Sequence, residues 1–390
     1  MTEETDTVVQ KHVFANRLYK AIANEHQNVS KNLVMSPVSL ELILIGAASG
    51  ARGRTREQIE EAMGMPLEAM KRRYAPFLDL LQSDATAIRI ATKMFVQKEL
   101  SLRENFVNEL REALFCEVGE VDFTNEHDLS LTAINGWVNE KTLGKIQELL
   151  KSGDITAQTK LVLANAIYFK GKWANPFKKE LTRKDKFNLP DGSQVDVDMM
   201  TVEKRFRYGS VQQLGAEVLE LPYEGEKLSM VILLPFAETP LSDLEGKVST
   251  PDFHLSDLLE ENTKNQDVTV FLPKFKVMLT TYLESVLQKL GMTLMFSDDA
   301  DFSGIVSTTE EHLKVGKVVQ KAYIEVNEEG TEAAASTGMV FMSKGVRRVK
   351  RFLVNRPFIL MLQDQVSGMI LFSGKVMDPS VLKEPVHLDS

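Results

Sequence analysis

The hydrophobic pattern of the chain changes near residue 186, and this change constrains the fold more than any other feature. Before it, apolar residues recur mainly at spacings of three and four, which predicts helices. After it, β-branched and aromatic residues gather in short runs, which predicts strands. Because both kinds of element are numerous and only partly segregated along the chain, we expect an α+β fold with several antiparallel sheets.

The expected elements fill most of the chain. Helices are expected at residues 13–23, 37–49, 55–63, 70–82, 103–114, 131–150 and 280–291. Strands are expected at residues 87–96, 159–173, 202–211, 216–223, 228–235, 267–278, 317–326, 351–364 and 368–377. A length of 390 residues ordinarily favours two or three domains, but no linker-like segment and no internal repeat divides this sequence. Residues 1–390 are therefore predicted to form a single domain.

Composition is that of an ordinary globular protein, with 43% hydrophobic and 26% charged residues. The formal net charge of −9 does not favour a nucleic-acid partner. The single cysteine, Cys116, excludes an intrachain disulfide, and its apolar neighbours predict a buried, unreactive thiol.

Signals for cellular location are weak. The first residues lack the charged and apolar regions of a signal peptide, and no apolar run is long enough to predict a membrane span. One glycosylation sequon, Asn28-Val29-Ser30, points only slightly toward secretion. Secretion as a mature chain is the expectation, with a cytoplasmic location as the alternative.

Patterns that indicate catalysis are missing. The histidines are scattered without metal-ligand spacing, and the glycine-containing segment 46–55 lacks a phosphate-binding pattern and is expected to end a helix. No nucleophile-elbow motif occurs. We therefore expect no enzyme activity, no metal and no cofactor. The basic run Lys71, Arg72 and Arg73 fits either a solvated helix face or an anion-binding surface.

Residues 328–336, EEGTEAAAS, have high helix propensity but lie between strand-like segments at 322–326 and 338–342. If the run were instead a strand, Thr331, Ala333, Ala335 and Thr337 would share one face. Small side chains on that face would let the segment enter a packed sheet, and Gly330 would supply the freedom to turn inward. A coiled form before such an insertion remains an alternative.

The same run belongs to a set of motifs that resemble those of the serpin family, in the family's order and across nearly the whole chain. They are SPVSL (36–40), INGWVNEKTLGKI (134–146), LVLANAIYFKGKW (161–173), LPKFKV (272–277), ADFSGI (300–305), NEEGTEAAAST (327–337), NRPFIL (355–360) and LFSGKVMDP (371–379). The resemblance, to inhibitory serpins such as the secreted ones of invertebrates, implies three β-sheets, eight or nine helices and an exposed reactive loop at about 330–350.

For the reactive loop, the resemblance implies a hinge and a reactive bond. The hinge comprises Glu328, Gly330, Thr331, Ala333, Ala335 and Thr337. The position of the attacked carbonyl relative to Glu328 gives Lys344, with Gly345 after the bond, and a lysine there suits a trypsin-like serine protease. Arg347 and Arg348 are competing positions. Cleavage would trigger insertion of the loop into the central sheet and trap the protease as a covalent acyl-enzyme.

The resemblance also assigns supporting residues. Ser36, Ser39, Asn165 and Gln320 correspond to a polar cluster beneath the point where the sheet opens, and Trp173, Lys274 and Glu328 to the point where the loop enters. Many family members have histidine at the position of Gln320, so a pH-dependent role for this cluster is in doubt.

The expected partner is a protease acting on a monomeric inhibitor, with a heparin-like polyanion at Lys71, Arg72 and Arg73 as a candidate accelerator. The alternative function is that of a carrier or chaperone on the same fold. The small residues from Ala333 to Thr337 favour inhibition, because relatives that do not insert their loop tend to have bulky, charged or proline residues there.

Overall fold

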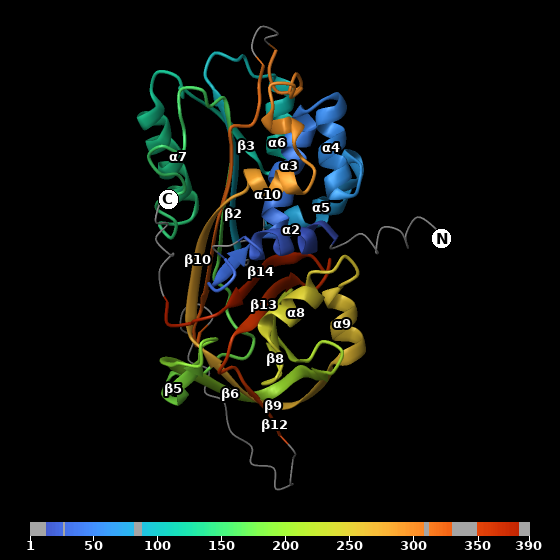
Figure 1. Ribbon diagram of the computed structural model, residues 1–390, viewed down its shortest axis with the longest axis vertical. Helices are drawn as coiled ribbons and strands as arrows, with labels where there is room; N and C mark the ends of the chain where they lie inside the picture. The colour runs from blue at the N-terminus through green and yellow to red at the C-terminus, as the bar shows by residue number, and fades with distance from the viewer. Residues whose placement is uncertain (1–12, 26–27, 82–87, 308–311, 330–348, 382–390) are drawn as a thin grey trace, which may run out of the picture.

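A computed structural model describes residues 13–25, 28–81, 88–307, 312–329 and 349–381, and Figure 1 shows an elongated molecule. Most helices gather around one half of the long axis, and most strands of the larger sheet lie in the other half (Figure 1). A smaller sheet that includes β2, β10 and β3 extends along the helical half, so it joins the two ends of the molecule (Figure 1).

Nine α-helices lie within the described residues. They are α2 (Val13–Ala23), α3 (Pro37–Gly50), α4 (Gly53–Met63), α5 (Leu67–Leu81), α6 (Glu104–Leu114), α7 (His127–Lys141), α8 (Leu241–Val248), α9 (Leu255–Asn262) and α10 (Glu284–Lys289). Short 3-10 helices occupy Lys179–Leu181 and Leu294–Phe296. Helix α3 has all its residues buried, because it runs through the core between the sheets and carries no polar face.

The smaller sheet has five strands in the order β10-β11-β4-β2-β3. Their bounds are β10 (Phe275–Tyr282), β11 (Lys317–Val326), β4 (Leu161–Phe169), β2 (Ile88–Gln97) and β3 (Glu117–Val121). Strand β4 is buried along its whole length, as expected for a central strand covered on both faces. Strands β11 and β4 pair in parallel, whereas each pairs antiparallel with its other neighbour.

The larger hydrogen-bonded sheet has nine strands and divides at the long strand β6. Its strands are β1 (Leu33–Met35), β5 (Arg183–Asn188), β6 (Gln194–Val211), β7 (Ala216–Pro222), β8 (Leu228–Pro235), β9 (Lys264–Pro273), β12 (Lys350–Leu353), β13 (Phe358–Asp364) and β14 (Ile370–Val376). Strands β5, β6, β9 and β12 form one part, and β7, β8, β13, β14 and β1 continue from the far end of β6 as the other. With the five-stranded sheet this makes three sheets.

The expected α+β class is therefore confirmed, with three sheets and nine helices among the described residues. Cys116 is buried, and the segment 46–55 does end a helix, since α3 stops at Gly50. The helix expected at 131–150 is wrong beyond Lys141. Leu143 and Gly144 adopt left-handed backbone conformations with φ of 53° and 76°, which a continuing α-helix cannot accommodate.

Ile146, Leu149 and Leu150, which follow α7, are buried in a loop rather than in a helix, whereas Leu143 is exposed. The side-chain oxygen of Asn135 accepts hydrogen bonds from the backbone N–H groups of Leu149 and Leu150, at 2.8 and 3.0 Å. The helix-like spacing of these residues therefore reflects the burial of a loop, which the Asn135 side chain of α7 holds in place by hydrogen bonds.

Other helices and strands differ from the sequence-based expectation, because some expected strands are divided and some observed elements were not expected. The expected strand 267–278 is two strands, β9 and β10, which separate at Lys274, and the expected strand 351–364 is interrupted after Leu353. Strands β1, β3 and β5 and helices α8 and α9 were not expected. Strand β5, with the sequence RKDKFN, is mostly exposed and carries no apolar pattern that would predict it.

Candidate functional site

The feature that sets this site apart is the seam between the parallel strands β4 and β11. Eight residue pairs join them, from Lys317 opposite Val162 to Ile324 opposite Phe169. The chain leaves β11 at Val326, and a segment that reversed direction there would run antiparallel to both β11 and β4. The seam can therefore accept one further strand only if its own ladder opens, because both strands are already paired on their other sides.

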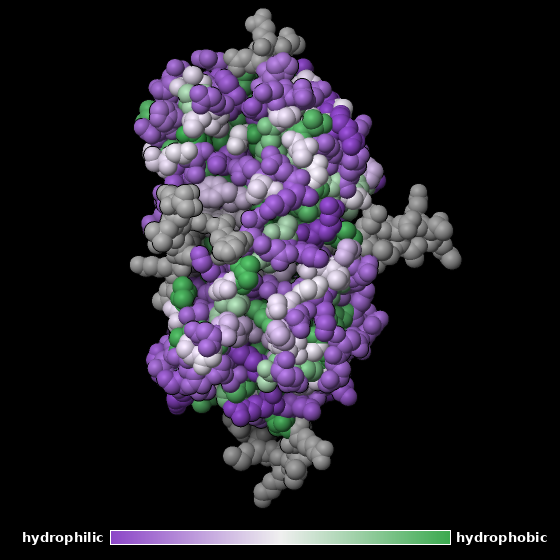
Figure 2. Space-filling view, in the orientation of Figure 1, coloured by the Kyte–Doolittle hydropathy of each residue, from purple (hydrophilic) through white to green (hydrophobic). Residues whose placement is uncertain are grey.

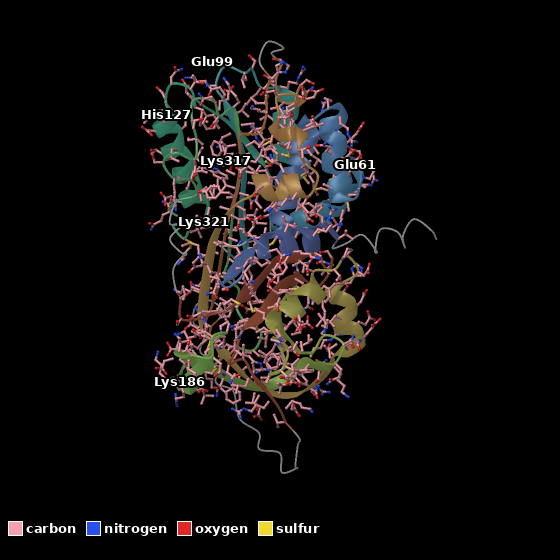
Figure 3. All side chains as sticks on the ribbon, in the orientation of Figure 1. Glu61, Glu99, His127, Lys186, Lys317 and Lys321 are labelled. Atoms are coloured by element: carbon pink, nitrogen blue, oxygen red, sulfur yellow. The ribbon has the colours of Figure 1, made fainter. Side chains whose placement is uncertain are left out.

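Gln320 and Asn165 face each other in the middle of the seam. Figure 3 labels Lys317 and Lys321 on β11, and Gln320 lies between them along the strand. The Gln320 Nε2 donates to Asn165 Oδ1 at 3.0 Å and to the Ser36 carbonyl at 2.9 Å, while Gln320 Oε1 accepts from the Ser36 N–H at 2.9 Å. One side chain thus ties β11 to β4 and to the first residues of α3.

Ser36 and Ser39 complete this polar group, called here the opening cluster together with Asn165 and Gln320. Ser36 caps α3 by accepting a hydrogen bond from the Ser39 N–H, and Pro37 occupies the first helical position. The Ser39 hydroxyl donates to Asn165 Oδ1 at 2.7 Å and accepts from Gln320 Nε2 at 3.1 Å. The four expected residues are therefore in mutual contact.

Asn165 uses its full hydrogen-bonding capacity. Its Oδ1 accepts from Ser39 and Gln320, and its Nδ2 donates to the Ser39 carbonyl and to Thr92 Oγ1, both at 3.1 Å. Thr92, on β2, was missed by the sequence analysis. Thr92 is only 3% exposed, but β2 also contains Arg89, Lys93 and Gln97, so no sequence signal marked it out.

The second group lies beyond the end of the seam and comprises Trp173, Lys274 and Glu328, called here the hinge anchor. The Trp173 Nε1 donates to the Asn327 carbonyl at 2.9 Å, and the Phe177 N–H donates to the Glu328 carbonyl at 2.9 Å. The Trp173 indole stacks on Tyr223, with ring centroids 4.3 Å apart. The backbone that follows β11 is therefore held in place as far as Glu329, the last residue described before the predicted loop.

Glu328 provides the charged contact of the hinge anchor. Its carboxylate lies 3.0 Å from Lys274 Nζ and accepts a hydrogen bond from Thr182 Oγ1 at 2.9 Å. Burial opposes ionisation of Glu328, but hydrogen bonds from Lys274, from its own backbone and from Thr182 together hold its pKa below the ordinary value. Thr182 was not predicted, and nothing in its sequence context distinguishes it.

A groove of about 480 Å³ adjoins the hinge anchor, lined by both lysines and carboxylates. Each of its four lysines has an acidic partner. The pairs are Lys179 with Glu329, Lys184 with Asp198, Lys274 with Glu328 and Lys276 with Glu325. Because these charges neutralise each other locally, the groove is no anion site.

The basic run on α5, Lys71 to Arg73, is less accessible to an anionic ligand than its sequence suggested. Lys71 Nζ lies 3.1 Å from Glu68 and 2.5 Å from Glu109, and the Arg73 guanidinium lies 5.7 Å from the Tyr74 ring centroid. Arg72 is the exposed member of the three. Lys71 and Arg73 are both partly buried, so the run is not a uniformly exposed face.

Several predicted positions lie outside the described residues. They are the hinge residues Gly330, Thr331, Ala333, Ala335 and Thr337 and the reactive bond Lys344 and Gly345. The described chain brackets them, with Glu329 on one side and Val349 on the other. Their roles stay predictions.

Three further observations bear on other expectations. The Asn28 side chain is buried and its Nδ2, the atom that a glycan would modify, donates to the Ile22 carbonyl at 2.9 Å. Across the described ranges, no cluster of three or more histidine, cysteine or acidic side chains is arranged to hold a metal ion. Within the same ranges, no helix is both long enough and apolar enough to cross a membrane.

Comparison with known proteins gives one consistent family. The family model described as serpin (serine protease inhibitor) matches residues 10–379. Serpin-Z1C of wheat, Triticum aestivum, is 37% identical over 388 residues, which cover 94% of each chain. The crystal structure of Serpin48, described as a highly specific serpin in the insect Tenebrio molitor, is 34% identical with a TM-score of 0.84 and covers 95% of this chain and 97% of that one.

Two similar structures contain ligands. Native protease nexin-1 with heparin is 31% identical with a TM-score of 0.85, covering 95% of this chain and 98% of that one. Thyroxine-binding globulin in complex with thyroxine is 27% identical with a TM-score of 0.84, covering 96% and 99%.

A match over nearly the whole chain, together with the three sheets and nine helices of its described part, defines the class of protein. The chain belongs to the serpin family, whose members are generally protease inhibitors rather than enzymes.

Proposed function

We propose that this serpin inhibits trypsin-like serine proteases as a suicide substrate, with Lys344 as the residue attacked. The observation that carries the proposal is the parallel seam between β4 and β11, held closed by its own ladder with the chain after β11 anchored beside it. Insertion of a serpin loop as an added strand in one of its own sheets is an established form of strand addition, and here that sheet is the five-stranded one. The hinge residues Thr331, Ala333, Ala335 and Thr337 supply small side chains for one face of that added strand.

The free energy of insertion is estimated from the ladder. Opening the seam breaks the ladder of eight residue pairs, and a strand of the same length between β4 and β11 forms two ladders in its place. The net gain is about eight hydrogen bonds, each contributing about 1 kcal/mol. That gain is comparable with the total stability of a domain, about 5–15 kcal/mol, so it is sufficient to drive a large rearrangement after cleavage.

The test is a reaction with trypsin followed by denaturing electrophoresis. A covalent acyl-enzyme complex appears as a stable band at the summed mass, and sequencing of the released fragment begins at Gly345. The Lys344→Ala variant forms no complex with trypsin, because it lacks the cation that fills the carboxylate pocket. The matched variant Arg348→Ala retains complex formation. A fragment that begins at Val349 would show cleavage after Arg348 and would overturn the assignment.

The hinge is tested separately from the reactive bond. The Ala335→Glu variant is cleaved by trypsin without forming a complex, because an unpaired carboxylate entering the sheet slows insertion relative to hydrolysis of the acyl-enzyme. The Ala335→Ser variant, which keeps a small side chain, retains inhibition. Complex formation by Ala335→Glu at the stoichiometry of the native chain contradicts the insertion mechanism.

A carrier function on the same fold is the alternative, supported by the likeness to thyroxine-binding globulin. A carrier is cleaved in the loop without forming a complex and gains no thermal stability on cleavage. Complex formation by the native chain distinguishes the two functions directly.

The proposals of a polyanion partner, of secretion and of a monomeric state have fewer supporting observations than the proposal of protease inhibition. The likeness to protease nexin-1 with heparin supports a polyanion near α5, and within the Lys71–Arg73 run Arg72 is the member most open to it. Unchanged inhibition rates across a heparin titration at low salt would contradict this. Secretion and a monomeric state are proposed with it, although the buried Asn28 amide removes the sequon as support for secretion.

A further inference from the structure

Helix α7 and the loop that follows it cover one face of the smaller sheet. Residues 127–155 are called here the covering segment, and their buried side chains pack on an apolar cluster that β2, β4 and β11 present on this face. Figure 2 shows a largely hydrophilic surface over the part of the molecule that carries α7, with scattered apolar areas. The covering segment thus contacts both strands of the seam that the proposed insertion would open.

One row of side chains crosses the whole sheet beneath the covering segment. From β10 to β3 the row consists of Tyr282, Val319, Ala164, Lys93 and Glu117. Directly paired residues point to the same face of a sheet, and Val319 and Ala164 belong to the apolar cluster, so the whole row faces the covering segment. Because β10 and β3 are the edge strands, the row runs from one edge of the sheet to the other.

Side chains at both ends of this row hold the covering segment. At the β3 end, Glu117 accepts a hydrogen bond from Trp137 Nε1 at 3.1 Å and lies 2.5 Å from Lys141 Nζ. At the β10 end, the Tyr282 hydroxyl donates to Asp154 Oδ2 at 2.7 Å. The covering segment is therefore attached to the sheet on both sides of the seam.

The covering segment cannot stretch to follow an opening sheet. The Asn135 side chain donates to the Leu150 carbonyl at 2.8 Å, in addition to the two hydrogen bonds that it accepts from the same loop. Asp154 is fixed in its turn, because its Oδ2 also accepts from the Lys151 N–H at 2.7 Å. A strand added between β4 and β11 moves the two ends of the row apart by about 4.8 Å, which no hydrogen bond survives. The contacts at one end must therefore break.

The packing indicates that the β10 end breaks. Strands β2 and β4 contribute Ala91, Phe95, Val162, Ala164 and Ala166 to the cluster, whereas β11 contributes one buried residue in the described part of the chain, Val319. Asp154 is also joined directly to β4 through residues 155–160. The covering segment therefore stays with β4. Its contacts with the other side are lost, namely the Tyr282–Asp154 hydrogen bond and that of Lys321 Nζ with the Glu148 carbonyl, at 2.8 Å.

We infer that Tyr282 is a positioning residue for loop insertion, and that breaking its hydrogen bond to Asp154 limits the rate at which the seam admits a strand. This inference rests on the proposed function. The bond stabilises the closed sheet and is absent once the sheet opens, so its removal lowers the barrier to insertion. Its effect is the same for every strand that enters, whichever protease attacks the loop.

The test variant is Tyr282→Phe, which removes the hydroxyl and keeps the ring. The ring retains its packing and its contact with Lys317 Nζ, which lies 5.0 Å from the ring centroid. The matched control is Tyr323→Phe. The Tyr323 hydroxyl donates to Glu325 Oε2 at 3.0 Å, but both residues lie on β11, so opening the seam does not stretch that bond.

The probe is a synthetic peptide with the sequence of residues 331–342, added to the full chain. The measurement is the rate at which the mixture gains a form with a higher unfolding midpoint, which reports a strand added to the sheet. Tyr282→Phe should take up the peptide at least about 5-fold faster than the native chain, as expected for the loss of a hydrogen bond to a charged group. Tyr323→Phe should match the native rate within about 2-fold. In an Asp154→Ala background, Tyr282→Phe should bring no further acceleration.

Equal uptake rates for Tyr282→Phe and the native chain overturn the inference, even if the variant unfolds at a lower temperature, because the hydroxyl would then stabilise the fold without limiting insertion. Equal acceleration in both tyrosine variants also overturns it, since that indicates a general loosening of the sheet. Failure of the proposed function is distinguished with trypsin. A native chain that forms no covalent complex but shows the expected uptake rates loses the protease assignment and retains the role of Tyr282. Absence of uptake in every variant contradicts the inference.

Discussion

Neutral hydrogen bonds hold the middle of the β4–β11 seam, whereas an ion pair holds the region beyond its end. The opening cluster is neutral and fully buried, and Asn165 satisfies every one of its side-chain hydrogen-bonding positions there. The hinge anchor instead depends on one carboxylate, Glu328, which pairs with the partly exposed Lys274. The comparison suggests a division of roles. The cluster resists opening at every physiological pH, while the anchor holds the start of the loop through a contact that charge changes can weaken.

The largest expected effect is that of removing the centre of the opening cluster. Asn165→Ala removes four hydrogen bonds, two to Ser39 and one each to Thr92 and Gln320, in a site closed to solvent. Each orphaned buried group costs about 1–3 kcal/mol, so we expect a loss of at least about 4 kcal/mol. In a chain of this length that is a fall of roughly 4 °C or more in the midpoint of thermal unfolding.

The control for this change is Asn125→Ala, at an exposed position where the lost contacts are those of the side-chain amide with the Asp122 carboxylate. Its midpoint should change by less than about 1 °C. Equal midpoints for Asn165→Ala and the native chain would show that the cluster does not hold the sheet closed.

A smaller effect, with a defined pH dependence, is expected at the hinge anchor. Glu328→Gln keeps the shape of the side chain but removes the charge that Lys274 and Thr182 contact, with an expected cost of about 2 kcal/mol at pH 7. The folded-state pKa of Glu328 is depressed, so its contribution is complete above the ordinary carboxyl value and is lost as the pH falls through the lower folded value.

The measurement is the unfolding midpoint of Glu328→Gln and of the native chain between pH 7 and pH 3.5. The difference between them should shrink below about pH 4.5, where the unfolded carboxyl begins to take up protons. Glu224→Gln, at an exposed position without an ion pair in the described part of the chain, is the control and should follow the native curve. A difference that grew toward low pH would contradict the contact.

Parts of this site were predictable and parts were not, for physical reasons. Ser36, Asn165 and Gln320 stood in motifs of a known family, and polar residues within strongly apolar segments are unusual enough to be noticed. Thr182 and the backbone carbonyl of Asn327 were invisible, because their partners are distant in sequence and their own surroundings are exposed.

The fold shows the same distinction. Strands with continuous apolar runs, such as β4 and β8, were placed closely, whereas the exposed strand β5 had no pattern to find. The apolar spacing at 142–150 was misleading, since hydrophobic periodicity reports burial and the left-handed residues at Leu143 and Gly144 decide where the helix ends.

A pH-dependent effect can also be built into the opening cluster, which at present contains no titratable side chain. Gln320→His would place an imidazole where Gln320 is 2% exposed, and burial would keep its folded pKa below the unfolded value of about 6.5. The unfolded chain then binds more protons, so the variant loses stability as the pH falls below about 6.5.

The unfolding midpoint of Gln320→His should therefore fall by roughly 1–2 °C relative to the native chain between pH 8 and pH 5.5. The native chain serves as the control, because glutamine does not titrate. Parallel curves for the two proteins over this range would mean that the imidazole accepts its proton without penalty and that the cluster is less closed to water than its burial indicates.

The smallest and sharpest test compares one hydrogen bond from each group by removing a threonine hydroxyl. Thr92→Val and Thr182→Val are nearly equal in shape, and the hydroxyls contact Asn165 and Glu328 at 3.1 and 2.9 Å. Loss of the Thr92 hydroxyl leaves a buried amide N–H unpaired and should cost about 1–3 kcal/mol. Loss of the Thr182 hydroxyl leaves Glu328 still paired with Lys274, so it should cost about 0.5–1 kcal/mol. At pH 7 the unfolding midpoint of Thr92→Val should therefore be lower than that of Thr182→Val. If Thr182→Val were the more destabilising, the end of the seam would hold the sheet more strongly than its middle, and the division of roles would be reversed.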